Sequence, residues 1–243
     1  MTSSFIPKNC GFIIPTGRAI SSVALTLAKL NQKQSREGKP PLWIPEQRVS
    51  GFSKWVMDLT PSRGKDCLFN MLQGIETEKA IFPHFPRPKD YTRELIYNDH
   101  SDEWEMIYLG TSENDSAHVF RTKKLTLRGQ PLYAKPDVIF RHRMTDEVII
   151  LEIKSSPADL PTICWPNVRA QLWAYADIDA DFMRVAPKIY LAAEVWNPKI
   201  NGMYLRKTYT WDAQDEVLHI EAKHAFEIYS GEFENPSLKR FLG

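Results

Sequence analysis

The chain has 243 residues, of which 43% are hydrophobic and 25% charged, and its formal net charge is +1. This composition is typical of a soluble globular protein and favours one large domain, or one domain with an appended segment. No apolar run is long enough to span a membrane, and no basic stretch precedes a long apolar one near the start, so we expect neither a membrane helix nor a signal peptide. The near-neutral charge gives no global sign of a nucleic-acid partner, which would have to be held by a local basic patch.

The first part of the chain is predicted to be helical. Residues 19–34 carry apolar side chains at helical spacing, and residues 49–59 predict a second, short helix. Residues 65–82 predict a third helix, which Gly74 weakens by roughly 1 kcal/mol relative to alanine. A proline-rich segment follows and ends it.

Strand patterns dominate from about residue 91. Apolar and β-branched runs separated by polar turns predict strands over residues 103–110, 118–127, 131–140, 148–156 and 188–195. A helix is predicted over residues 167–178, between the last two of these strands. The tail predicts two or three more strands, over residues 204–211, 217–226 and 226–230.

This order of elements predicts an α/β fold, with a mixed central β-sheet flanked by helices, an extra N-terminal helical segment and C-terminal strands. We expect residues 1–60 to form the helical extension and residues 61–243 the main domain, whose core covers about residues 65–195.

Three ionisable residues at the margins of two apolar strands predict a reactive site. Side chains alternate across a strand, so Glu152 and Lys154 project from one face and Ile153 from the other. Asp137 begins the preceding strand, and the turn between the two strands predicts an antiparallel pair that brings Asp137 close to Glu152. Two neighbouring carboxylates repel each other unless a cation joins them, and hard oxygen ligands suit Mg²⁺ or Mn²⁺. A lysine beside them can orient a water molecule or neutralise charge that develops on a phosphate.

Pro136-Asp137 followed by Glu152-Ile153-Lys154 resembles the motif of the PD-(D/E)xK nuclease superfamily. Gln171 and Tyr175 lie four residues apart on one helical face and resemble the QxxxY motif of the RecB-like and Cas4-like branch. Upstream, Gly74 and Glu78 resemble the GxxxE of the phage-type recombination exonucleases, with Glu76 as the alternative acid.

The resemblance implies a restriction-endonuclease-like core and a metal-dependent deoxyribonuclease that hydrolyses phosphodiester bonds. It implies that Asp137, Glu152 and Lys154 are catalytic. The implied metal ion is Mg²⁺ or Mn²⁺. Its ligands would be Glu78, Asp137, Glu152 and the carbonyl of Ile153. The implied substrate-binding residues are Gln171, Tyr175, Lys135 and Arg169.

The chain also departs from this family. Many relatives have a glycine before the metal-binding aspartate, where this chain has Lys135-Pro136, and Lys135 shares the strand parity of Asp137. Three isolated cysteines, Cys10, Cys67 and Cys164, cannot supply the four ligands of an iron–sulfur cluster, so we expect no cluster. Their sparse, odd number also argues against disulfides or structural zinc and favours a reducing, cytoplasmic location.

The pathway is less constrained by the sequence. The absence of a GxxxxGK[ST] helicase motif favours a stand-alone phage, repair or defence exonuclease. Its partner would be duplex or single-stranded DNA, with a homo-oligomer or a partner protein also open. The choices between exonuclease and endonuclease, and between DNA and RNA, are not determined by these residues.

Two alternatives stay open at this point. The chain can be a catalytically inactive nucleic-acid-binding or scaffold module of the same fold, or the motif can be accidental. Two rival acid-x-lysine triplets occur, Glu37 with Lys39 in an expected loop and Glu221 with Lys223 on an expected strand. Several residues also have ordinary structural interpretations: Gln171 and Tyr175 as the packed face of a helix, Glu78 as a solvated acid, and Lys123, Lys124 and Arg128 as an exposed strand face. Arg141, His142 and Arg143 are expected in a turn, either solvated or in contact with a phosphate backbone. Trp165 and Trp173 are expected in the core, with stacking on an unpaired base as the alternative.

Overall fold

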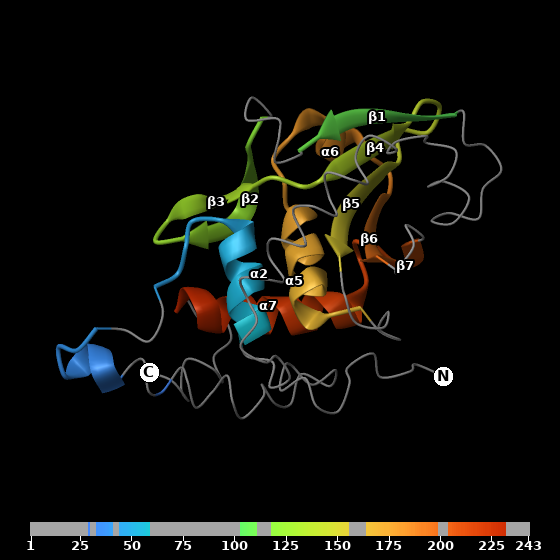
Figure 1. Cartoon of the computed structure of the whole chain (residues 1–243). Helices are drawn as coiled ribbons and strands as arrows, with labels where there is room; N and C mark the ends of the chain where they lie inside the picture. Colours follow the sequence, from blue (N-terminus) through green and yellow to red (C-terminus); the bar gives the residue numbers. More distant parts are fainter. Residues whose placement is uncertain are drawn as a thin grey trace.

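A computed structural model of the chain describes residues 29, 33–40, 44–58, 103–110, 118–155, 164–198 and 204–231. Within these ranges the protein is a mixed α/β structure, with a five-stranded sheet and helices packed against it (Figure 1). The helix predicted over residues 19–34 lies largely outside the described residues, and the one over 65–82, with Gly74, Glu76 and Glu78, lies wholly outside them.

The central sheet confirms the predicted mixed topology. Its strands lie in the spatial order β1 (Trp104–Leu109), β4 (Val138–His142), β5 (Val148–Ser155), β6 (Ile189–Pro198) and β7 (Tyr204–Asp212). The neighbours β5 and β6 are parallel, and every other pair is antiparallel. A parallel pair needs a crossover connection, and here it contains α5 (Pro166–Tyr175) and the short α6 (Asp181–Val185).

A separate hairpin consists of β2 (Phe120–Leu127) and β3 (Gln130–Ala134). Arg128 and Gly129 form its two-residue turn with φ angles of 54° and 72°, the left-handed pair that matches the twist of a tight hairpin. The prediction of one strand over residues 131–140 is therefore wrong, because the chain leaves this hairpin after β3 and enters the central sheet at β4. Pro136 lies at the break, where its missing N–H removes a ladder hydrogen bond.

The C-terminal helix of the structure corrects a second prediction. The strands expected over residues 217–226 and 226–230 are one helix, α7 (Glu216–Ser230). Its buried residues Leu218, Ala222 and Phe226 follow a four-residue spacing, which the strand prediction overlooked. Asp215 caps the start by accepting a hydrogen bond from the Leu218 N–H at 2.8 Å, and Gly231 ends the helix in the left-handed conformation, with φ 74°.

The main hydrophobic core places α5 at the centre of the molecule. All residues of α5 except Asn167 are buried, between the sheet, α7 and α2 (Val49–Asp58). The Phe52 ring of α2 lies 5.3 Å from that of Phe226 on α7. The Tyr229 hydroxyl accepts from the Glu46 N–H at 2.6 Å and donates to the Glu46 carbonyl at 3.1 Å. Residues 46–58 therefore share one core with the C-terminal helix.

None of the helices within the described ranges is long and apolar enough to cross a lipid bilayer.

Candidate active site

The pairing of β4 with β5 brings the predicted acids together. Val138 lies opposite Leu151, so Asp137 and Glu152 are the next residues on either side of this antiparallel pair. The Asp137 carboxylate accepts a hydrogen bond from the Ile153 N–H at 2.7 Å. This bond attaches Asp137 to the strand that carries Glu152, as the hairpin prediction required.

Strand alternation then decides which face carries the cluster. Ile139 and Ile150 belong to the hydrophobic core on the α5 side, whereas Phe140 and Leu151 pack in a second cluster on the opposite side. Asp137 and Glu152 share the parity of Ile139 and Ile150, so both face α5. Glu152 is only 2% exposed, and a carboxylate so deeply buried needs polar partners.

Lys154 supplies the cationic partner. Its ammonium group pairs with the Oε1 atom of Glu152, while the Lys154 side chain keeps 31% of its surface exposed. The lysine therefore connects a buried carboxylate to a region that solvent can reach. A group in that position can contact a ligand without leaving the acid.

Gln171 and Tyr175 of α5 complete the cluster from the helix side. The Gln171 amide donates to Glu152 Oε1 at 2.7 Å and to the Tyr175 hydroxyl at 2.8 Å. The Tyr175 hydroxyl in turn donates to the Lys135 carbonyl at 3.0 Å. One chain of hydrogen bonds thus runs from β5 through α5 to the segment just before Asp137.

Burial dominates the electrostatics of this cluster. Asp137 as a whole residue is partly exposed, yet its carboxyl group is enclosed, and this burial raises its pKa against the lowering effects of Lys154, the Ile153 N–H and Lys135. Burial also raises the pKa of Tyr175 well above its usual value, and the charges of Glu152 and Asp137 raise it further. Tyr175 therefore stays protonated near neutral pH and can keep donating to Lys135.

The donor set suits a hard cation. Asp137 and Glu152 offer carboxylate oxygens, which Mg²⁺ and Mn²⁺ prefer, and a cation between them would offset the cost of two buried acids. The described residues contain no group of three or more histidine, cysteine, aspartate or glutamate side chains that could hold a metal. Glu78 and its alternative Glu76, predicted as further acids, lie outside those residues.

The remaining predicted residues divide between the cluster and the interior. Lys135 lies beside the site, because its charge lowers the pKa of Asp137 and its carbonyl binds Tyr175. Arg169 points elsewhere: its guanidinium pairs with Glu221 of α7 at 2.8 Å, and the two side chains are 3% and 1% exposed. The substrate contact predicted for Arg169 stays a prediction, although the structure gives this side chain an interior partner.

The rival triplets have simpler explanations. Lys39 pairs with Glu37 at 2.6 Å on an exposed turn. Glu221 and Lys223 lie on α7 and not on the expected strand, so their two-residue spacing does not place them on one face.

The prediction that Arg141 and His142 lie in a turn is also wrong. Both residues belong to β4, where they bind acids next to or within β1. Arg141 pairs with Glu105 at 2.6 Å, and the buried His142 ring lies 2.8 Å from Glu103. The two residues therefore attach β4 to its neighbouring strand.

The end of β1 also contributes to the site, which the sequence pattern did not predict. The Gly110 N–H donates to the Asp137 carbonyl at 2.8 Å. A Cβ atom added at Gly110 would lie 2.1 Å from the Pro136 carbonyl oxygen. Burial raises the pKa of Tyr108 to about 12, and the charge of Asp137 adds to this effect. Glycine at the close of an apolar strand was the available signal for such a close approach.

No protein-family model and no curated protein matches this sequence. The superfamily resemblance therefore rests on the motif residues and their arrangement alone.

Proposed function

We propose that the protein is a divalent-metal-dependent nuclease that hydrolyses phosphodiester bonds in DNA, with a core of the PD-(D/E)xK type. The observation that carries this proposal is the junction of β4, β5 and α5. There, two acids on paired strands, a lysine on the same strand face and a Gln–Tyr pair of the central helix form one hydrogen-bonded cluster. Each of these residue types has a use in phosphodiester hydrolysis.

Asp137 and Glu152 would hold the Mg²⁺ or Mn²⁺ ion, together with the Ile153 carbonyl and an acid such as Glu78. When bound, such an ion activates water and stabilises the leaving oxygen. Lys154 orients the attacking water or neutralises the charge that develops on the phosphate. Gln171 fixes the Glu152 carboxylate, and Tyr175 fixes the backbone that leads to Asp137.

A cleavage assay tests the proposal. End-labelled linear duplex, linear single-stranded and closed circular DNA would each be incubated with Mg²⁺, with Mn²⁺ and with EDTA. We expect metal-dependent loss of linear DNA, and we expect Asp137→Asn, Glu152→Gln and Lys154→Ala each to abolish it while the protein stays folded. Survival of the circular substrate would identify an exonuclease.

The chain provides a matched control in its exposed acid-x-lysine triplet. Lys39→Ala removes a lysine paired with a glutamate two residues away, as Lys154 is, but on an exposed turn. Cleavage should therefore persist in Lys39→Ala. Salt-sensitive DNA binding without products in any metal would instead favour the non-cleaving module, and undiminished cleavage in Lys154→Ala would remove that lysine from the mechanism.

A further inference from the structure

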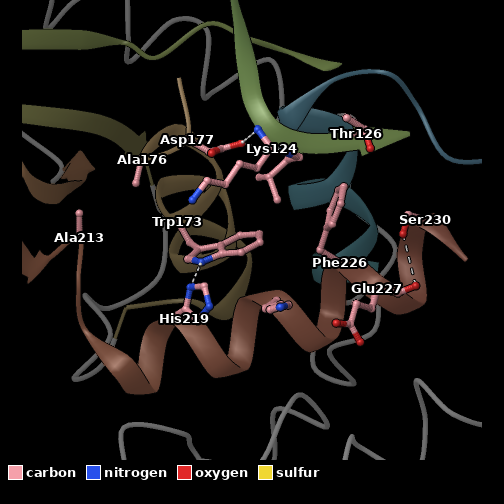
Figure 2. Close-up of a pocket in the computed structure, with 12 residues that line it drawn as sticks. Lys124, Thr126, Trp173, Ala176, Asp177, Ala213, His219, Phe226, Glu227 and Ser230 are labelled. Atoms are coloured by element: carbon pink, nitrogen blue, oxygen red, sulfur yellow. Dashed lines mark hydrogen bonds between the residues drawn. The ribbon is translucent and has the colours of Figure 1, made fainter. Parts of the chain in front are cut away.

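A pocket of about 550 Å³ lies apart from the acid cluster and on another side of α5. Gln171 and Tyr175 face the acids, whereas Trp173, Ala176 and Asp177 face this pocket. The β2–β3 hairpin covers it from one side and α7 from the other (Figure 2). Its volume lies within the range of small-molecule sites.

Two aromatic rings give the pocket a rigid apolar wall. Trp173 and Phe226 are each 7% exposed, and their ring centroids lie 6.2 Å apart. Phe52 packs against both rings from α2, at 6.4 Å and 5.3 Å. A wall held in this way suits a flat ring system, because little side-chain freedom is lost when a ligand binds.

One end of the pocket is cationic. Lys124 of β2 and Lys223 of α7 both line it, and both lie near enough to His219 for their charges, after burial, to lower its pKa. The Trp173 indole N–H donates to His219 Nδ1 at 3.2 Å, so the neutral imidazole carries its proton on Nε2. Lys124, Lys223 and His219 thus line one pocket, and two cationic side chains with an imidazole N–H suit a phosphate.

The position of Lys124 is fixed by the backbone. One carboxylate oxygen of Asp177 accepts from the N–H groups of Lys124 and Leu125, each at 2.7 Å. These bonds join the hairpin to the segment that follows α5. The Asp177 carboxylate keeps its negative charge, so Lys124 and Lys223 together with Asp177 leave this end of the pocket with a net positive charge.

The opposite end of the pocket carries hydroxyl groups beside the aromatic wall. Thr126 and Ser230 line it together with Phe226 (Figure 2). The Ser230 hydroxyl donates to the Glu227 carbonyl at 3.4 Å. The pocket therefore fits a ligand with negative charge at one end and a flat ring at the other.

We infer that this pocket binds a nucleoside phosphate, with the phosphate on Lys124, Lys223 and His219 and the base against Trp173 and Phe226. The ligand is either a free nucleotide or one nucleotide unit of a nucleic-acid strand. The inference does not rest on the proposed nuclease activity, because none of these side chains belongs to the acid cluster.

Calorimetry in EDTA tests the inference without any cleavage. The ligands are 2′-deoxyadenosine 5′-monophosphate, 2′-deoxyadenosine, inorganic phosphate and a short single-stranded oligodeoxyadenylate. We expect the monophosphate to bind more tightly than either the nucleoside or phosphate alone. The double variant Lys124→Gln/Lys223→Gln should weaken it by roughly ten- to a hundredfold, since two charge-assisted contacts are lost.

Lys123→Gln is the matched control, because Lys123 is the exposed neighbour of Lys124 on β2 and does not line the pocket. Its affinity should equal that of the unmodified protein. Binding of the oligonucleotide alone, weakened by the double variant, would support the inference and identify the ligand as a strand unit. Absence of binding by both nucleotide ligands, or equal affinity in the double variant and the control, would overturn it. Phosphate binding that gains nothing from the base would overturn it as well.

The two proposals fail separately. If the unmodified protein binds the nucleotide but cleaves no DNA, only the nuclease proposal fails. If it cleaves DNA but binds neither nucleotide ligand, only the pocket proposal fails.

Discussion

At the scale of single residues, the candidate site depends on a few hydrogen bonds between β4, β5 and α5. Gln171 is central, because its amide group reaches both Glu152 and Tyr175. Tyr175 then extends the network to the Lys135 carbonyl. Buried polar groups linked in this way are costly to disrupt, since removal of one member leaves the next without its bond.

Tyr175→Phe tests this network. The substitution keeps the buried ring but removes the hydroxyl that donates to Lys135 and accepts from Gln171. We expect the free energy of unfolding to fall by about 1 to 3 kcal/mol, measured by urea denaturation. Tyr133→Phe is the control, because Tyr133 lies 44% exposed on β3 and should lose almost nothing. Equal stability of the two variants would contradict the account.

Sequence reasoning reached most of this cluster for physical reasons. Alternation along a strand places Glu152 and Lys154 on one face, and the four-residue spacing places Gln171 and Tyr175 on one face of a helix. The direction of the Arg169 side chain does not follow from the sequence pattern. Since α5 is buried almost all round, its pattern could not indicate that Arg169 turns toward α7.

At the scale of elements, the end of β1 contacts the backbone at Pro136 and Asp137, between β3 and β4. Gly110 approaches the Pro136 carbonyl so closely that even a methyl group would collide with it. The Gly110 N–H also binds the Asp137 carbonyl. The position of Asp137 therefore depends on β1 as well as on its own hairpin.

Gly110→Ala should displace this backbone. We expect a loss of more than about 2 kcal/mol in the free energy of unfolding, since the clash is with backbone and cannot be relieved by a side-chain rotation. Gly129→Ala is the comparison: its φ is +72°, but no atom lies within 4 Å of the added Cβ. That change should cost only about 1 kcal/mol. A Gly110→Ala protein as stable as Gly129→Ala would show that β1 does not constrain Asp137.

The two wrong element predictions have a common cause. In residues 217–230, a short apolar pattern was interpreted as strands, although Asp215 and Gly231 mark the two ends of a helix. In residues 131–140, two apolar runs on either side of Lys135, Pro136 and Asp137 were interpreted as one strand, although the chain changes sheet at Pro136. Local periodicity describes burial, whereas the partner of each strand depends on contacts far along the chain.

At the scale of the whole molecule, a buried ion pair joins the central helix to the C-terminal one. Arg169 of α5 and Glu221 of α7 pair in the interior at 2.8 Å. Burial raises the pKa of Glu221 to about 7, against the lowering effect of Arg169. Removal of one charge from such a pair lowers the free energy of unfolding, because the other charge stays buried without its partner.

The raised pKa of Glu221 predicts a pH dependence of stability. Between its ordinary value of 4.5 and about 7, the folded protein binds a proton that the unfolded chain does not, so stability falls as the pH rises through this window. We expect this group to make the protein up to about 3 kcal/mol more stable near pH 5 than near pH 8. Urea denaturation measures the free energy of unfolding at the two pH values. In Glu221→Gln, the difference between them should be smaller by this contribution of Glu221.

An exposed glutamate provides the control for this measurement. Glu37→Gln changes a side chain that is 38% exposed, so it should keep the pH dependence of the unmodified protein. A Glu221→Gln protein with that same pH dependence would show that Glu221 does not titrate in the window.

The contact between Glu46 and Tyr229 joins residues 183 positions apart. During synthesis, α2 leaves the ribosome long before the side of the core that receives it exists, because α5 and α7 are made later. Phe52 of α2 cannot make its contacts with Phe226 and Tyr229 until these two residues have been synthesised. Closure of so long a loop is slow compared with local helix formation. We therefore expect the nascent chain to expose the apolar face that α2 turns toward α5 and α7 until those two helices have been made.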